Sequence, residues 1–197
     1  MTILHIDSSI SGEASASRAI SRSIVDRLVA EHPGAQIIGR DLVADPLPHM
    51  TLASFQDVEV LDEFLGADAV VIGAPMYNFT LPTQLKAWLD RILIAGKTFR
   101  YTAEGPEGLA GGRRVIIALA RGGIYSPGSA AASLEHLESY LRGVFNFIGI
   151  DPEFVAADGL AISPEQRDIS IRQAQPCRLA RPVRADEFAS EGRLGKI

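Results

Sequence analysis

Three short segments of the sequence carry residue types that suit the binding of a phosphate or of a flat conjugated ring. The first segment, residues 7–17, is rich in hydroxyl side chains, those of Ser8, Ser9, Ser11, Ser15 and Ser17. A helical pattern follows it directly, and the unpaired amides at the start of a helix attract anions. The segment therefore predicts a phosphate site, although Ser15 or Ser17 acting as an ordinary helix cap explains the same pattern equally well.

The second segment, Ala74-Pro75-Met76-Tyr77-Asn78-Phe79, combines a thioether, two aromatic rings and an amide. Such a set can stack on a flat ring and hydrogen-bond to its edge. Taken singly, Met76 and Phe79 are more often core residues than ligand contacts, because both types are usually buried. Their grouping with Tyr77 and Asn78 favours a ring-binding segment.

The third segment, residues 120–126, places Arg121 ahead of Gly122 and Gly123 and includes Tyr125. Glycines allow a ligand to approach the backbone closely, and backbone amides can stabilise a developing negative charge. A plain turn with an exposed arginine explains this segment equally well when it is considered alone.

All three segments follow strands of one predicted parallel sheet. Short apolar runs predict strands at residues 3–7, 36–41, 69–73, 114–119 and 154–157. Helical patterns are found around Ile20, Ile24 and Leu28, at residues 58–65, at residues 85–92 after Pro82, and at residues 131–147. Strands that alternate with helices form right-handed βαβ units, so we expect an α/β fold with a doubly wound five-stranded parallel sheet, helices on both faces and residues 69–73 in the centre. The ligand crevice of such a sheet lies beyond the carboxyl ends of its strands, where the three segments lie.

The composition favours a single domain that binds a small ligand. The chain has 197 residues, of which 47% are hydrophobic, so it can bury a core without a disulfide or a metal. A formal net charge of -5 provides no basic surface for nucleic acid or for an anionic membrane. A single cysteine, Cys177, and the lack of a signal-peptide pattern predict a cytoplasmic protein.

Several other chemistries lack their sequence signals. The sequence has no Walker motif for a nucleoside triphosphate, and no Gly-x-Gly-x-x-Gly for a dinucleotide follows the first strand. It has neither a Gly-x-Ser-x-Gly elbow nor zinc-ligand spacing. Asp7 could belong to a phospho-acceptor receiver domain, but the third strand ends in Gly73-Ala74-Pro75 instead of the acceptor aspartate. We interpret His5 and Trp88 as structural residues and Cys177 as incidental.

Longer motifs surround the three segments. They are His5-Ile6-Asp7-Ser8-Ser9 with Ser15-Ala16-Ser17, Ala74 to Phe79 running into Thr83-Gln84-Leu85-Lys86, Gly96-Lys97-Thr98-Phe99-Arg100-Tyr101, Gly105-Pro106-Glu107-Gly108-Leu109, Arg121-Gly122-Gly123 and Phe147-Ile148-Gly149-Ile150. Together they resemble the FMN-dependent NADH:azoreductases, which also reduce quinones and belong to the flavodoxin-like superfamily. The resemblance implies a flavodoxin-like FMN-binding domain at residues 1–173, followed by a divergent tail at residues 174–197 that we expect to be poorly ordered or peripheral.

The resemblance also implies the roles of individual residues. The FMN phosphate would be held by Ser9, Ser15, Ala16 and Ser17. The isoalloxazine would be bordered by Pro75, Met76, Tyr77, Asn78, Phe79, Ala120, Arg121, Gly122 and Gly123. The family is homodimeric with active sites at the subunit boundary, and the candidate substrate contacts are Tyr101, Phe147, Arg121 and Tyr125. No side chain is expected to act as a catalytic nucleophile, and no metal is expected.

The chain departs from the family pattern in two places. Residues 43–59 look shorter than the excursion that helps to wall the pocket in relatives. The tail, broken by Pro176 and Pro182, replaces an expected closing helix.

We therefore expect an FMN-dependent oxidoreductase that takes hydride from NADH or NADPH and reduces quinones and azo compounds by a ping-pong mechanism. The amides of Gly122 and Gly123 would stabilise the reduced ring, and Arg121 would steer anionic substrates. Two other classes are compatible with the fold. A flavodoxin-type electron carrier would turn over little NADH, and a non-catalytic small-ligand module would purify without colour.

Overall fold

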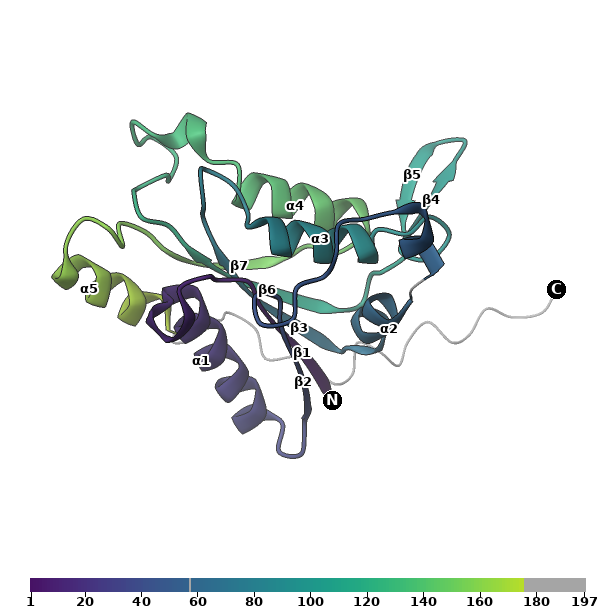
Figure 1. Ribbon diagram of the computed structural model, residues 1–197, viewed down its shortest axis with the longest axis horizontal. Coiled ribbons are helices and arrows are strands. Elements are labelled where there is room, and N and C mark those ends of the chain that lie inside the picture. Colours follow the sequence, from purple (N-terminus) through teal and green to yellow (C-terminus); the bar gives the residue numbers. More distant parts are fainter. Residues whose placement is uncertain (57, 176–197) are drawn as a thin grey trace.

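A five-stranded parallel sheet forms the centre of the protein, with its strands in the order β2-β1-β3-β6-β7 (Figure 1). The computed structural model describes residues 1–56 and 58–175. The strands of the sheet are β1 (Thr2–Asp7), β2 (Gln36–Asp41), β3 (Ala69–Pro75), β6 (Arg114–Ala120) and β7 (Glu153–Ala157). The strand order reverses between β1 and β3, which is the arrangement of a doubly wound sheet. The predicted sheet, with β3 in the centre, is confirmed.

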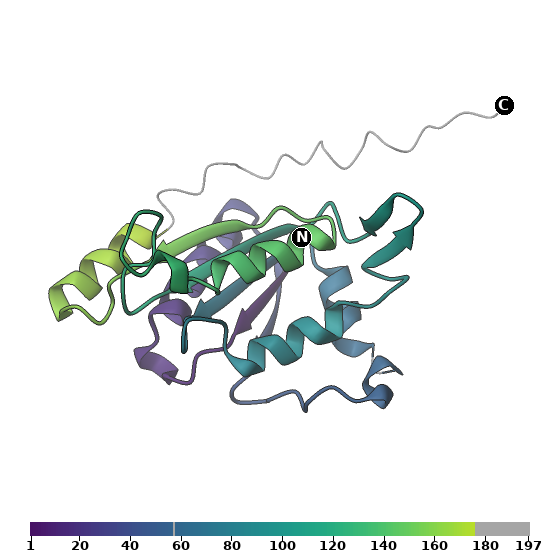
Figure 2. The same cartoon turned by 90° about the horizontal axis from the view of Figure 1, so that it is seen from above.

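Helices cover both faces of this sheet, as predicted. They are α1 (Ala16–Glu31), α2 (Glu59–Gly66), α3 (Thr83–Ile92), α4 (Glu138–Phe147) and α5 (Pro164–Ala174). On one face, α1 packs Ile20 and Ile24 in a core with Val71 and Ile116. On the other face, α2, α3 and α4 share a separate core with β3 and β6, and Figure 2 shows α4 in front of the strands. In the described part of the chain, no helix is both long and apolar enough to span a membrane.

The central strand is apolar along its whole length because helices cover it on both sides. All 7 residues of β3 are buried. Gly73 pairs with Asp7 of β1, and a Cβ atom at Gly73 would lie 2.7 Å from Asp7 Oδ1 and 3.3 Å from the carbonyl oxygen of Ser17. Glycine at this position therefore lets the start of α1 lie close to the sheet.

The helix predicted at residues 131–147 starts later than expected. Ala132–Leu134 forms a short 3-10 helix, and α4 begins at Glu138. The carboxylate of Glu135 accepts hydrogen bonds from the amides of residues 137–139 at 3.0, 2.8 and 3.1 Å. The predicted start was wrong because this side chain caps the helix, and apolar spacing does not reveal a cap.

The sequence pattern also misses β4 (Phe99–Thr102) and β5 (Gly105–Gly108), which form an antiparallel hairpin beyond α3. The two strands are short and largely exposed, so they lack the alternation that marks a half-buried strand. A Cβ atom at Gly108 would lie 2.1 Å from the nitrogen of Gly149. This close backbone contact fastens the hairpin to the end of α4.

A helix that the sequence pattern did not predict, α5, ends the described part of the chain. Ser163 caps α5 by accepting a hydrogen bond from the amide of Gln166 at 3.1 Å, and Pro164 occupies the first turn. The helix ends at Ala174, ahead of Pro176. Its largely polar sequence gives it little apolar periodicity, which explains why the pattern does not reveal it. From residue 176 onward, the predicted tail lies outside the described residues.

Candidate functional site

The three predicted segments follow β1, β3 and β6 and meet at the carboxyl edge of the sheet; we call residues 8–17, 74–80 and 120–126 the rim. The hydroxyl of Tyr77 lies 3.1 Å from Ser9 Oγ and accepts a hydrogen bond from the amide of Ile10, also at 3.1 Å. The amide of Met76 donates to the carbonyl of Ala120 at 2.9 Å. The second loop is therefore bonded to both of the others.

The first loop combines the two interpretations that the sequence left open. Ser15 caps α1, because its Oγ accepts a hydrogen bond from the amide of Arg18 at 3.3 Å, and it lies 3.1 Å from the Oγ of the buried Ser17. Within the described residues, the amides of Ala16 and Ser17 donate no hydrogen bond. A capped helix with free first-turn amides remains able to attract an anion.

The second loop turns back on itself in a strained conformation. Asn78 and Phe79 have φ angles of 47° and 71°, and Tyr77 and Thr80 exchange backbone hydrogen bonds of 2.9 and 3.1 Å across them. Positive φ at both central residues is typical of a type I′ turn, where Phe is uncommon. Strained residues of this kind cluster at ligand sites. The side chain of Phe79 is 43% exposed, so the strain presents an aromatic ring at the rim.

The third loop is held mainly through its carbonyl groups. The carbonyls of residues 121–123 accept hydrogen bonds from the amides of Leu160, Ala161 and Gly159 at 2.9 to 3.1 Å. In the described part of the chain, the amides of Gly122 and Gly123 donate no hydrogen bond. Tyr125 packs edge-to-face on the ring of Phe79 across the rim, with centroids 6.4 Å apart. The glycine amides are thus free to bind a negatively charged ligand atom.

Arg121 does not have the exposed position that substrate steering requires. Its side chain is only 5% exposed and pairs with Asp158 at 2.5 Å, Glu138 at 3.4 Å and Glu135 at 3.6 Å. Burial would raise the pKa of Glu135, but the amides that it caps and the charge of Arg121 hold that pKa below its usual value. The expectation that Arg121 steers anionic substrates is corrected, because three carboxylates already surround its guanidinium.

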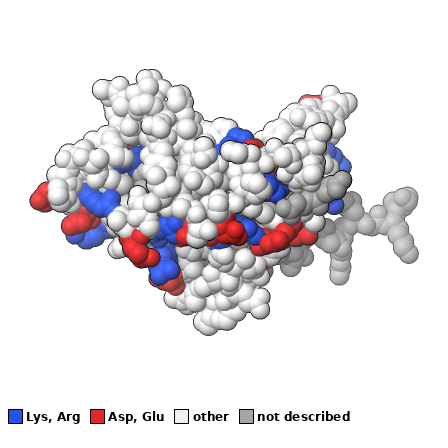
Figure 3. Space-filling model, in the orientation of Figure 1, with Lys and Arg blue, Asp and Glu red and all other residues white. Residues whose placement is uncertain are grey.

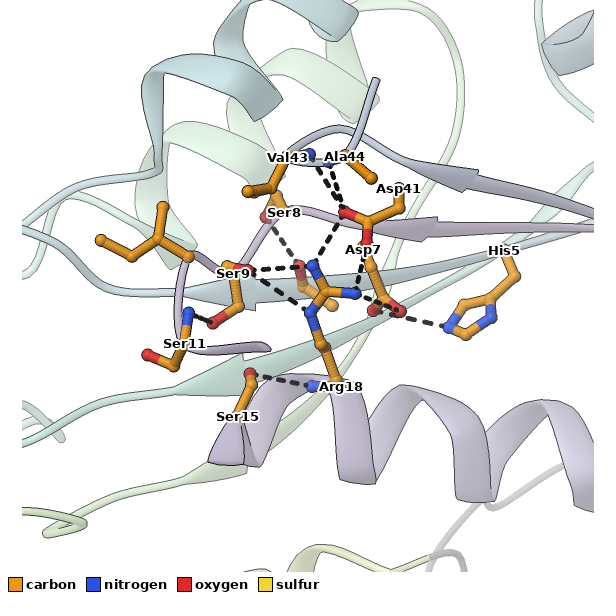
Figure 4. A network of polar contacts seen from close by, with 12 residues as sticks. His5, Asp7, Ser8, Ser9, Ser11, Ser15, Arg18, Asp41, Val43 and Ala44 are labelled. Carbon is orange, nitrogen blue, oxygen red and sulfur yellow. Dashed lines mark hydrogen bonds and ion pairs between the residues drawn. The ribbon is translucent and has the colours of Figure 1, made fainter. Parts of the chain in front are cut away.

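A second arginine network, which sequence reasoning missed, lies behind the first loop (Figure 4). Arg18 donates to both carboxylate oxygens of Asp41, at 2.7 and 2.8 Å, and to the carbonyl of Ser9 at 3.0 and 3.3 Å. The hydrogen bonds from Arg18 lower the pKa of Asp41 to about 2. The one available signal was Asp41 at the end of the second strand, level with Asp7 of the first.

The structure also brings a serine, a histidine and an aspartate together, but not as a nucleophilic triad. His5 Nε2 lies 2.9 Å from Ser21 Oγ and 3.6 Å from Asp7, so one ring nitrogen faces both groups. The Ser21 hydroxyl is buried and donates to Asp7 or to the carbonyl of Arg18. Burial lowers the pKa of His5. The cluster is structural, which agrees with the interpretation of His5 from the sequence.

Tyr101 and Phe147 lie together but away from the rim of the same chain. The ring of Phe99 contacts both, with centroids 5.7 Å from Tyr101 and 4.7 Å from Phe147. This cluster lies beyond the end of α3, whereas the rim lies at its start (Figure 1). A helix of this length spans about 15 Å. An apolar groove of about 380 Å³ adjoins the cluster and is lined by Leu93, Ser139, Tyr140, Gly143, Val144 and Phe147.

A protein-family model described as a flavodoxin-like fold matches residues 1–176. Two relatives named FMN-dependent NADH:quinone oxidoreductase are similar over most of the chain. The one from Methylorubrum extorquens (strain PA1) is 54% identical and covers 88% of this chain and 95% of its own. The second, from Bradyrhizobium diazoefficiens, is 52% identical with the same coverage.

Solved structures of similar proteins agree with this match. The crystal structure of an azoreductase from Bacillus anthracis has a TM-score of 0.80 at 28% identity, covering 89% of this chain and 95% of that one. An FMN-dependent NADH-azoreductase from the same organism, solved in complex with FMN, has a TM-score of 0.77 at 28% identity and covers 89% of this chain and 96% of that one.

The alignment with the Methylorubrum relative also shows a difference in length. The alignment is 193 positions long but includes only 88% of this chain, which is about 173 of its 197 residues. About 20 positions of the relative therefore have no counterpart in this chain. This chain is therefore shorter than that relative within the aligned range.

Proposed function

The chain belongs to the flavodoxin-like family that includes the FMN-dependent NADH:quinone oxidoreductases, and from this premise we propose that it is an FMN-dependent oxidoreductase that transfers electrons from NADH to quinones and azo compounds. The observation that carries the proposal is the rim. It combines serine hydroxyls and free helix amides in one loop with two free glycine amides in another, and Tyr77 belongs to the loop that joins them. These donors suit the two ends of FMN, its phosphate and its ring.

Each part of the rim has a distinct task in this proposal. When bound, FMN would supply the hydride and electron-transfer chemistry, and the protein contributes binding, orientation and electrostatics. The amides of Ala16 and Ser17, with the hydroxyls of Ser9 and Ser15, hold the phosphate. The amides of Gly122 and Gly123 stabilise negative charge on the ring.

The direct test is a flavin reconstitution assay. Purified protein is mixed with FMN, and oxidation of NADH is followed with and without a quinone or an azo dye. Turnover that requires both FMN and acceptor is expected. Flavin binding with little NADH turnover would indicate an electron carrier instead, and failure to take up FMN would indicate a non-catalytic module.

A matched pair of serine variants on α1 tests the phosphate end of the rim. We expect Ser17→Ala to weaken FMN binding. Ser23→Ala on the same helix should not, because the Ser23 hydroxyl donates to the carbonyl of Ile20 and lies about 9 Å farther along the helix than Ser17. Equal FMN affinity in both variants and in the wild type would count against the assignment of Ser17.

We also propose that the donor and the acceptor use the same face of the flavin in turn, which gives ping-pong kinetics. The support is that all three ligand loops lie at one edge of the sheet, so a single opening serves both substrates. Initial rates measured at several NADH and quinone concentrations should give parallel double-reciprocal lines. Intersecting lines would show that both substrates bind before reaction.

We also propose that the protein forms a homodimer. Tyr101 is 74% exposed and lies a helix length from its own rim, so it can contribute to substrate binding only at the rim of a second copy. The apolar groove between α3 and α4 adjoins it, and the upper part of the face shown in Figure 3 bears few charged side chains. Light scattering after size-exclusion chromatography should give twice the monomer mass. Tyr101→Ala should raise KM for the quinone without changing FMN affinity.

NADPH as an alternative donor and a cytoplasmic location also remain proposals. The single cysteine, which precludes an internal disulfide, supports the location. Comparison of kcat/KM for the two nucleotides and fractionation of the producing cell test these two points.

A further inference from the structure

The peptide bond between Ser9 and Ile10 is held from both sides, by Tyr77 and by Arg18, and Figure 4 shows the Arg18 side. On one side its carbonyl accepts hydrogen bonds from Nη2 and Nε of Arg18 at 3.0 and 3.3 Å. On the other side its amide donates to the Tyr77 hydroxyl at 3.1 Å. In a planar trans peptide, the carbonyl and the amide point in opposite directions. The group that holds the carbonyl therefore also sets the direction of the amide.

Arg18 is itself fixed by the end of β2. Its Nη1 and Nη2 atoms bind the two carboxylate oxygens of Asp41, and one of these oxygens also accepts hydrogen bonds from the amides of Val43 and Ala44 at 3.0 and 3.3 Å. Asp7 lies 3.7 Å from the same guanidinium. A bidentate pair of this kind fixes the plane of the guanidinium as well as its position.

The charge of this network argues against direct binding of an anion by Arg18. Two carboxylates, those of Asp41 and Asp7, lie within 4 Å of one guanidinium, so the group carries a net negative charge. The donor atoms Nε, Nη1 and Nη2 already have acceptors. Arg18 is therefore suited to orient a peptide and poorly suited to attract a phosphate.

We propose that Arg18 is a positioning residue for the phosphate end of the cofactor, acting by turning the Ser9–Ile10 amide toward the rim and its carbonyl away from it. This inference rests on the proposed function, because it takes the first loop as the phosphate site. Without Arg18, only the Tyr77 hydroxyl holds this peptide, so its carbonyl oxygen can turn toward the phosphate, where the two negative groups repel each other.

The test compares FMN with riboflavin, which has the same ring and sugar chain but no phosphate. Dissociation constants of both flavins are measured for the flavin-stripped full chain by quenching of flavin fluorescence. In Arg18→Ala, the Kd of FMN should rise about tenfold or more while that of riboflavin stays within about twofold, because a misdirected Ser9 carbonyl repels only a ligand that carries the phosphate. Arg18→Lys should also lose most of the preference for FMN over riboflavin, since an ammonium group cannot hold the Asp41 carboxylate and the Ser9 carbonyl in one plane.

Two further variants separate the alternatives. Asp41→Asn should also weaken FMN binding selectively, by a smaller factor. Arg27→Ala, farther along α1, should leave both constants unchanged. Fluorescence of the single tryptophan, Trp88, checks that each variant is folded.

Each contrary result has a distinct meaning. Equal weakening of FMN and riboflavin in Arg18→Ala and Arg18→Lys would overturn the inference in favour of a purely structural role. Tighter FMN binding by Asp41→Asn would overturn it in favour of direct phosphate binding by a released Arg18. A wild-type protein without preference for FMN over riboflavin would overturn the proposed phosphate site itself, before any variant is considered.

Discussion

Two arginines lie behind opposite ends of the rim, and their surroundings differ in a way that separates stability from binding. Arg121, behind the third loop, is 5% exposed and pairs with the carboxylates of Asp158, Glu135 and Glu138. Arg18, behind the first loop, is 20% exposed and divides its hydrogen bonds between Asp41 and a backbone carbonyl of the loop. One guanidinium holds structural elements together, and the other holds a peptide in one orientation.

The difference shows that the same residue type acts through its charge in one place and through its geometry in the other. The carboxylates around Arg121 come from the end of β7 and from the start of α4, so the arginine neutralises charges that the fold brings together. Arg18 makes its second set of hydrogen bonds to the loop itself. We therefore expect loss of Arg121 to affect mainly folding and loss of Arg18 to affect mainly cofactor binding.

The largest effect is expected for Arg121→Ala. The substitution leaves three neighbouring, partly buried carboxylates without their cation, which should lower the free energy of unfolding by about 3–5 kcal/mol. Urea unfolding followed by Trp88 fluorescence measures the change. Arg142→Ala is the matched control, because Arg142 binds Glu138 at 2.9 Å in an exposed pair and its loss should cost less than about 1 kcal/mol. Similar losses in both variants would remove the distinction between buried and exposed pairs.

A smaller loss of stability is expected for Arg18→Ala. The Ser9 carbonyl and Asp41 lose their donors, but Asp41 is 36% exposed and keeps its hydrogen bonds from the amides of Val43 and Ala44, so the free energy of unfolding should fall by about 1–2 kcal/mol. The comparison of the two arginines requires this loss to be smaller than that of Arg121→Ala in the same urea assay. A larger loss of unfolding free energy in Arg18→Ala than in Arg121→Ala would contradict the comparison of the two arginines.

Acid should weaken the Arg18 network in a defined pH range. The pKa of Asp41 is about 2 in the folded protein against a reference value of 3.8, so its stabilising contribution is present above the reference value and is lost as the pH falls through about 2. Because Asp41 is partly exposed, we expect a contribution of only about 1 kcal/mol. Urea midpoints at pH 5 and at pH 2.5 should differ less for Asp41→Asn than for the wild type. Identical differences would show that the pair does not contribute.

The smallest change in stability is expected for Asn78→Gly in the second loop, which belongs to neither network. Glycine adopts the φ of 47° without strain, so the free energy of unfolding should stay within about 0.5 kcal/mol of the wild-type value. FMN should nevertheless dissociate faster if the Asn78 amide contacts the ring, as the resemblance implies. Unchanged flavin release would leave Asn78 with a role in the turn alone.

Much of the fold follows from patterns that are local in the sequence. The runs at residues 69–73 and 114–119 are apolar because both faces of these strands are buried, and this local property predicted the sheet. The hairpin at residues 99–108 and the helix at residues 164–174 are short or polar, so burial leaves little pattern in them. The start of α4 depends on one capping side chain, Glu135, and the pattern cannot reveal it.

The residues of the candidate site also differ in whether the sequence reveals them. The serines ahead of α1, the segment from Met76 to Phe79 and the two glycines were recognisable because each group is concentrated in a short segment that directly follows a predicted strand. Their assigned roles in cofactor binding remain predictions. Arg18 and Asp41 are ordinary polar residues 23 positions apart, and no local feature connects them.

The sequence alone therefore determined which strands form the sheet and which three loops lie at its carboxyl edge, because both follow from apolar periodicity and chain order. Only the tertiary structure decided that Arg121 is buried among carboxylates and that the Ser9–Ile10 peptide is held between Arg18 and Tyr77. Charge neutralisation and peptide orientation depend on atoms brought within a few ångströms of each other by separate elements, and that proximity is a property of the packed fold.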